Sequence, residues 1–197
     1  NFSWVIGFFI EVLYYISYKN TNIEAIYDLQ KERKIYNKTY SQILNEKIIT
    51  PLKLKNTYYG GKINLADNEV NSYAFTGIWL KQPETDMSIP LGAGAIVANP
   101  SDLNTFIAAL LNGKLVSAQS LVQMKTIKEN YGMGLIRVPF NEHVGYGHGG
   151  AIDGFTSMLY YFPSNQLAVA ITSNGNNYEN NQILTNHVWY KPVAFAR

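Results

Sequence analysis

Two apolar runs in the last third of the chain, Phe155 to Phe162 and Leu167 to Thr172, constrain the fold more than any other stretch. Both runs are rich in aromatic and β-branched residues, and the turn-forming trio Pro163-Ser164-Asn165 separates them. Runs of this composition divided by turn residues are typical of adjacent antiparallel strands. We therefore predict a β-hairpin over residues 155–172.

A glycine-rich segment, Tyr146-Gly147-His148-Gly149-Gly150-Ala151, precedes this hairpin. Glycine weakens a strand, so a strand that keeps several glycines indicates that another group approaches its backbone closely. One interpretation is an edge strand that binds a peptide-like substrate by strand addition, with His148 beside it. The alternative is that the glycines mark a β-bulge and that His148 is a partly exposed polar residue.

The composition excludes several classes of protein. The chain has 197 residues, of which 47% are hydrophobic and 14% aromatic, so we expect a single globular domain over residues 1–197. Sixteen basic and 14 acidic residues give a net charge of only +2, which argues against a nucleic-acid partner. There is no cysteine, and the three histidines are scattered, so we predict neither a metal site nor a cofactor.

The N-terminal region, Phe2 to Ile16, is apolar but interrupted by Gly7 and Glu11. This run is shorter than the roughly 20 residues that span a bilayer, and it carries neither a basic leader nor a small-residue cleavage pattern. We interpret it as buried core or as a segment separated from its partners. Because the chain opens on Asn1 rather than Met, we expect further sequence upstream.

Apolar residues at helical spacing predict three helices. Thr21 and Glu24 have capping-box spacing, which predicts a helix starting near Asn22. A second helix is predicted over residues 40–49, with Pro51 as its stop. The third follows Asn99, which can cap it, and ends near Gly113.

The remaining pattern is less regular. We predict a short helix over residues 117–125, a strand over 131–138 and a closing helix over 176–190. Residues 56–91 carry Gly, Asn, Asp and Pro between short apolar pieces, which indicates a long functional loop or a lid over a site. Consecutive antiparallel strands preceded by helices predict an α+β fold, an antiparallel β-sheet flanked by helices.

Five motifs then occur in an order that resembles a known family. They are Tyr18-Lys19-Asn20-Thr21-Asn22, residues 49–57, residues 92–102, Tyr131-Gly132-Met133-Gly134 and Gly147-His148-Gly149-Gly150. Over residues 17–190 the chain resembles the class C β-lactamase-like serine hydrolases, which include D-alanyl-D-alanine carboxypeptidases, penicillin-binding proteins and related esterases. The resemblance implies a partial β-lactamase/transpeptidase-like fold and a location in the periplasm or otherwise outside the cytoplasmic membrane.

The resemblance also implies roles for two residues of the Tyr-x-Asn element. Tyr18 would act in proton transfer at the serine hydroxyl or the leaving group, and Asn20 would bind the substrate amide carbonyl. A phenol has a pKa near 10, so Tyr18 could act as a base only if a nearby positive charge lowers its pKa. In the family that charge comes from the lysine of the Ser-x-x-Lys motif.

The glycine segment would be the third element of the family's site. His148 would orient the base and bind the substrate carboxylate, while Gly149 and Gly150 would line the bound substrate. Ala151 would offer a main-chain N–H to an oxyanion hole. Expected substrates are acyl-D-alanyl peptides, β-lactams or small esters.

The first element of the family's site is missing from this sequence. No serine, from Ser3 to Ser173, is followed by lysine three positions later. An acyl-enzyme cannot form without its nucleophile. Two hypotheses remain open: the chain is a portion of an active acyl-transfer enzyme whose nucleophile lies elsewhere, or it is a non-catalytic remnant or binding module that retains the carboxylate-binding strand.

Overall fold

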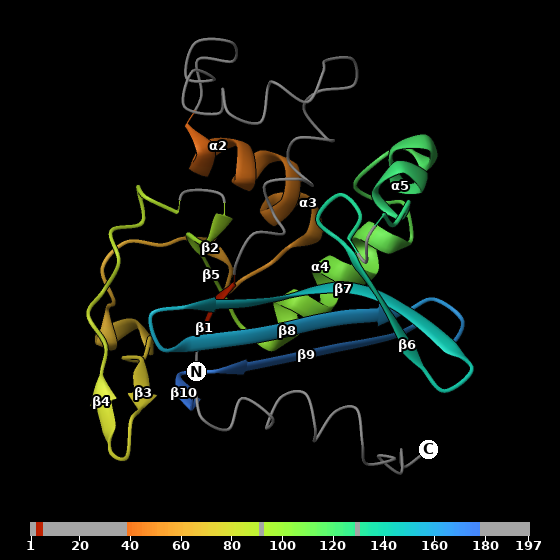
Figure 1. Cartoon of the computed structure of the whole chain (residues 1–197). Coiled ribbons are helices and arrows are strands. Elements are labelled where there is room, and N and C mark those ends of the chain that lie inside the picture. Colours follow the sequence, from red (N-terminus) through yellow and green to blue (C-terminus); the bar gives the residue numbers. More distant parts are fainter. Residues whose placement is uncertain (1–2, 6–38, 91–92, 129–130, 178–197) are drawn as a thin grey trace.

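The computed structural model describes residues 3–5, 39–90, 93–128 and 131–177, and its main layer is a four-stranded antiparallel sheet (Figure 1). The strands lie in the order β6-β7-β8-β9. Their bounds are β6 Ile136–Phe140, β7 His143–Ile152, β8 Phe155–Phe162 and β9 Leu167–Ser173. The predicted hairpin is therefore confirmed, with a turn at residues 163–166 between β8 and β9.

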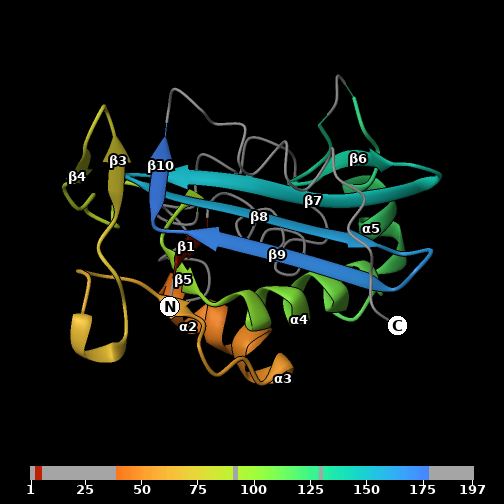
Figure 2. The same ribbon diagram turned by 90° about the horizontal axis from the view of Figure 1, so that it is seen from below.

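One helix, α4 (Pro100–Leu111), packs along one face of this sheet beside β8 and β9 (Figure 2). Its N-terminus is as predicted: the side-chain oxygen of Asn99 accepts a hydrogen bond from the Asp102 N–H at 2.9 Å. Its C-terminus is followed by Gly113 at φ 72°, a conformation that favours glycine. The short helix α5 (Ala118–Met124), capped by Ser117, confirms the next helix prediction.

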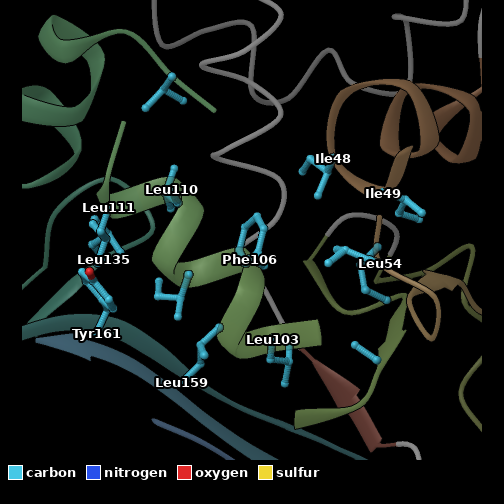
Figure 3. Packing of buried hydrophobic residues seen from close by; sticks show 14 of the residues in the cluster. Ile48, Ile49, Leu54, Leu103, Phe106, Leu110, Leu111, Leu135, Leu159 and Tyr161 are labelled. Atoms are coloured by element: carbon cyan, nitrogen blue, oxygen red, sulfur yellow. The ribbon is translucent and has the colours of Figure 1, made fainter. Parts of the chain in front are cut away.

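The hydrophobic core lies between α4, the sheet and the helical segment before α4. Fully buried Phe106 of α4 lies at its centre, and Leu159 and Tyr161 of β8 face the helix from the sheet (Figure 3). Burying side chains of this size contributes about 1.5–3 kcal/mol each. Apart from these three, the fully buried members of the cluster are Leu44, Ile48, Ile96, Ala98, Leu103, Ile107, Leu110, Met124 and Leu135.

The predicted helix over residues 40–49 is present as a composite of three pieces. These are α2 (Tyr40–Leu44), the π-helix η3 (Asn45–Ile49) and α3 (Thr50–Leu52). The prediction that Pro51 stops the helix is wrong, because Pro51 lies inside α3. Pro51 closely follows the π-helical turn η3, where the Thr50 N–H bonds the Asn45 carbonyl and the regular α-helical hydrogen-bond ladder is interrupted. The helical segment ends instead at Lys53, which is left-handed at φ 56°.

The irregular crossing from residue 56 to 91 contains short pieces of structure. They are β2 (Tyr58–Tyr59), the 3-10 turn η4 (Leu65–Asp67), β3 (Tyr73–Phe75) and β4 (Trp79–Lys81). β2 pairs with β5 (Ile96–Ala98), which also pairs with β1 (Ser3–Val5). β3 lies between β4 and β10 (Gly175–Asn177). It pairs with β4 in antiparallel and with β10 in parallel orientation.

Three other sequence-based predictions either differ from the structure or lie outside the described residues. Residues 176–177 belong to β10, so a helix starting at residue 176 is wrong, and the rest of that predicted helix lies outside the described residues. The helix predicted near Asn22 also lies outside them. The strand predicted at 131–138 is wrong in its bounds, since it runs from Ile136 to Phe140. It includes Pro139, because an edge strand tolerates a residue without an N–H.

The fold class is nevertheless as expected: a main antiparallel sheet with helices packed beside it, in an α+β arrangement. Among the described residues, no helix combines the length and the apolar character needed to cross a membrane.

Candidate active site

The glycine-rich segment forms β7, whose two halves have different surroundings. β6 pairs only with residues 143–147 of β7, whereas β8 pairs with residues 146–152. Within the described part of the chain, the edge of His148–Ile152 that faces away from β8 therefore has no strand beside it. Such an edge is a template for pairing with an extended peptide.

The β-bulge interpretation of the glycines is wrong, because the β7–β8 ladder runs without interruption from Tyr146 to Ile152. Instead, the glycines have different roles. A Cβ on Gly147 would lie 1.9 Å from the carbonyl oxygen of Leu159, so β8 itself requires glycine there. A Cβ on Gly149 would meet only the Ser157 carbonyl oxygen at 3.5 Å, an ordinary contact. Packing against β8 therefore does not require glycine at position 149.

His148 points to the same face of the sheet as α4. It pairs directly with Leu159, a core residue on that face, and side chains of directly opposed residues share a face. Its Nδ1 is hydrogen-bonded to the carbonyl oxygen of Gly149. Its Nε2 lies 3.0 Å from the hydroxyl oxygen of Tyr131, and the two rings meet edge to face with centroids 5.6 Å apart.

Burial lowers the pKa of His148 below its ordinary value, because an imidazolium loses hydration in this site. The hydrogen bond to the Gly149 carbonyl acts in the opposite direction and is the smaller of the two effects. The folded protein therefore favours the neutral imidazole.

The lowered pKa of His148 predicts that the stability of the folded protein depends on pH. Below the unfolded-state pKa of about 6.5, the unfolded chain binds a proton that the folded protein resists, so the free energy of unfolding falls as the solution becomes more acidic. The fall amounts to at most about 1.4 kcal/mol per pH unit, and it ends once the pH is below the folded-state pKa. Urea unfolding at several pH values measures it.

The matched control for this prediction is His148→Gln, which keeps a polar side chain but cannot titrate. The pH dependence of unfolding should be shallower in the variant over about pH 7 to 5. Identical slopes in the two proteins would show that His148 has an unshifted pKa.

A cation lies against Tyr146, whose side chain is on the same face of β7 as His148. The Nζ atom of Lys125, at the C-terminal cap of α5, is 4.5 Å from the ring centre of Tyr146. Tyr146 precedes His148 by two residues on β7, so both side chains point to one face. This end of the strand therefore combines an imidazole, two phenols and an ammonium group, a set that suits an anionic ligand.

The turn after β7 is hydrogen-bonded to the irregular segment of residues 56–91. Asp153 is half-buried, and its carboxylate accepts hydrogen bonds from the backbone N–H and the hydroxyl of Thr85, at 3.1 and 2.6 Å. Asp153 is therefore not a solvated turn residue but is fixed by two hydrogen bonds to the distant Thr85. Glu142, in the turn before β7, is exposed, and its carboxylate lies 3.2 Å from Nε2 of His143.

The predicted site residues fall into two groups. His148, Gly149, Gly150 and Ala151 follow one another along β7. Tyr18 and Asn20 lie outside the described residues, so their approach to His148 stays a prediction.

Sequence reasoning assigned no role to Tyr131, which contacts the imidazole directly. Only one sequence feature could have indicated this contact. Tyr131 is part of the Tyr131-Gly132-Met133-Gly134 motif, in which it precedes two closely spaced glycines. The described residues contain no cluster of three or more potential metal ligands.

The antiparallel sheet, the buried helix against it and the histidine-bearing glycine strand define a serine-hydrolase fold of the penicillin-recognising kind. Residues 15–189 match the profile of the family described as Beta-lactamase. The chain belongs to the beta-lactamase family.

Solved structures agree on the fold. The D-amino acid amidase from Ochrobactrum anthropi SV3, complexed with L-phenylalanine amide, is similar at a TM-score of 0.67 and 22% identity, over 81% of this chain and 51% of the amidase. A D-stereospecific amidohydrolase from Streptomyces sp. gives 0.67 and 25%, over 79% and 49%. FmtA from Staphylococcus aureus gives 0.62 and 18%, over 87% and 52%. The chain thus spans about half the length of these proteins.

Proposed function

We propose that this chain forms the sheet side of an acyl-transfer site of the D-alanyl-D-alanine carboxypeptidase, β-lactamase or esterase type. The observation that carries the proposal is the half of β7 from His148 to Ile152, which has an imidazole on its inner face and, among the described strands, a neighbour on one edge only. An acyl-D-alanyl peptide, a β-lactam or a small ester would lie along this edge. A role of this kind fits a location outside the cytoplasmic membrane.

In this proposal the substrate is held by main-chain and charge interactions. Those main-chain groups of the Gly149–Gly150 segment that point away from β8 hydrogen-bond the extended substrate, as in strand addition. The substrate carboxylate lies near His148, with Lys125 adding positive charge from the end of α5. The N–H of Ala151 stabilises the oxyanion that forms on the scissile carbonyl.

The chemistry further requires groups that lie outside the described residues. Tyr18 would transfer the proton and Asn20 would bind the substrate amide. The attacking hydroxyl and its lysine would come from a Ser-x-x-Lys segment outside this sequence. The serine oxygen attacks the carbonyl carbon, the leaving group takes the hydroxyl proton, and water then hydrolyses the acyl-serine.

The names of two similar proteins support a D-configured amide or peptide substrate. One is a D-amino acid amidase and the other a D-stereospecific amidohydrolase, and both share this fold with the chain. The second candidate function is a binding module without turnover, which is favoured by the absence of Ser-x-x-Lys from the sequence.

A fluorescent penicillin tests the proposal on the 197-residue chain as it stands. We expect reversible binding, seen by fluorescence polarisation, and no covalent label after denaturing electrophoresis. His148→Gln should weaken binding about 10-fold or more, because it removes the group that the proposal places beside the substrate carboxylate and that can carry a balancing positive charge.

Two controls make this experiment decisive. His143→Gln changes the histidine at the start of β7, which is hydrogen-bonded to Ser164, and should leave binding unchanged. Covalent labelling of the chain would refute the proposal that its nucleophile lies elsewhere, and an absence of reversible binding would refute the substrate class. If a Ser-x-x-Lys segment is encoded upstream, the longer protein should be labelled covalently, whereas a pure binding module should not be.

A further inference from the structure

Tyr131 is held in place by backbone hydrogen bonds. Its N–H donates to the Lys128 carbonyl and its own carbonyl accepts from the Lys128 N–H, both at 2.9 Å. The next two residues are fixed as well: the Gly132 N–H donates to the Leu135 carbonyl at 2.7 Å, and the Met133 N–H to the Met124 carbonyl at 3.1 Å. The position of the phenol relative to β7 is therefore set by the main chain.

Glycine is required next to Tyr131 for this arrangement. A Cβ at Gly132 would lie 2.3 Å from the Met124 carbonyl oxygen at the end of α5. The loop can therefore approach α5 this closely only because position 132 has no side chain. The close approach brings the Tyr131 ring edge-on to the ring of His148.

The hydrogen bonds of His148 specify one tautomer. A backbone carbonyl can only accept, so the bond to Gly149 requires a proton on Nδ1. In the neutral ring Nε2 then carries a lone pair, and its partner at 3.0 Å, the Tyr131 hydroxyl, must donate. The Nδ1–H tautomer is the minor form of a free histidine side chain in water, so the protein must select it.

We infer that Tyr131 is a positioning residue that fixes His148 in the Nδ1–H tautomer by donating its hydroxyl proton to Nε2. The consequence of this inference for catalysis rests on the proposed function. The assignment of the tautomer itself does not depend on that function. The Nε2 atom is the one directed at Tyr131, while Nδ1 is turned back to the strand. The phenol therefore controls the only ring nitrogen not bonded to β7 itself.

Protonation of His148 would reverse the direction of this hydrogen bond. An imidazolium donates from both nitrogens, so Nε2–H would donate to the Tyr131 oxygen. The hydroxyl proton of Tyr131 would then turn away from His148 and become a donor for another group. Tyr131 is 41% exposed, so a bound carboxylate could accept this hydrogen bond with the imidazolium behind it.

The test is NMR of the imidazole nitrogens in the 197-residue chain. In the wild-type protein above the pKa of His148, Nδ1 should have the chemical shift of a protonated nitrogen and Nε2 that of an unprotonated one. In Tyr131→Phe, which keeps the ring contact and removes the O–H, the population of the Nε2–H tautomer should rise measurably, because only the bond to the Gly149 carbonyl still opposes it. Tyr161→Phe removes a hydroxyl from the same sheet face, where it bonds Asn112, and should leave the tautomer unchanged.

Two results would overturn the inference. One is a wild-type His148 in the Nε2–H tautomer, a measurement that needs no variant to fold. The other is a Tyr131→Phe protein that keeps the Nδ1–H tautomer unchanged. Failure of the proposed function is distinguishable, because a chain that does not bind penicillin but changes tautomer in Tyr131→Phe would refute the function and support the positioning role.

Discussion

Replacement of Gly147 by alanine is expected to destabilise the folded chain by about 3 kcal/mol, near the upper end of the usual cost of overpacking. The new Cβ would lie 1.9 Å from the Leu159 carbonyl oxygen and 2.6 Å from the Tyr160 ring. The carbonyl belongs to the neighbouring strand, so the clash can be relieved only by separating β7 from β8. Urea unfolding followed by circular dichroism gives the change in free energy.

The matched control is Gly149→Ala, two residues further along the same strand. There the nearest contact of the new Cβ is 3.5 Å from the Ser157 carbonyl oxygen, which is ordinary van der Waals distance. We expect Gly149→Ala to change the free energy of unfolding by less than about 1 kcal/mol. Equal losses in the two variants would contradict the packing of β7 against β8 described above.

Phe106→Ala is expected to cost about 3–5 kcal/mol, which is the usual penalty for removing a buried phenylalanine. The side chain is fully buried and lies in the core between α4 and the sheet. Total stabilities of about 5–15 kcal/mol are normal for a domain, so this loss is a large fraction of the whole. Thermal or urea unfolding of the purified variant measures it.

Val122→Ala provides the comparison for the core variant. Val122 is on α5 and is 67% exposed, so its truncation should change stability by no more than about 0.5 kcal/mol. If Phe106→Ala were as stable as Val122→Ala, α4 could not be packed as described. The strand of the proposed substrate site, β7, would then have no rigid support, because His148 pairs with Leu159, which belongs to the same core as Phe106.

The two glycine variants also separate structure from function within one motif. Gly147 serves the sheet, while Gly149 is open to close approach and is placed in the proposed substrate site. Gly149→Ala is therefore expected to weaken penicillin binding while leaving the fold intact. The motif thus combines a residue required for packing with a residue proposed for substrate binding, two positions apart.

Elements with strong local signals were predicted well. The β8–β9 hairpin combines β-branched runs with a turn, and α4 has a capping asparagine, a proline at its first position and a glycine beyond its end. In each case the local preferences and the tertiary fold favour the same structure. The family resemblance, confirmed by the match over residues 15–189, came from motifs that keep their order along the chain.

The errors occurred where distant contacts decide. The role of Asp153 could not be predicted, because the sequence does not show that Thr85, 68 residues away, supplies two hydrogen-bond donors to its carboxylate. The bounds of β6 were wrong because pairing with β7, not local composition, decides where that strand begins and ends. Strand pairing is a non-local property, and single-strand propensity predicts it poorly.

The sequence by itself determined the α+β class, the hairpin, the helix against the sheet and the place of His148 in a glycine strand, because these depend on local propensity and on the spacing of apolar residues. Only the tertiary structure decided that Gly147 is needed by β8, that His148–Ile152 extends beyond β6, and that Tyr131 contacts the imidazole. These facts depend on contacts between residues that are far apart in the chain. Such contacts cannot be predicted from the local preferences of any single segment.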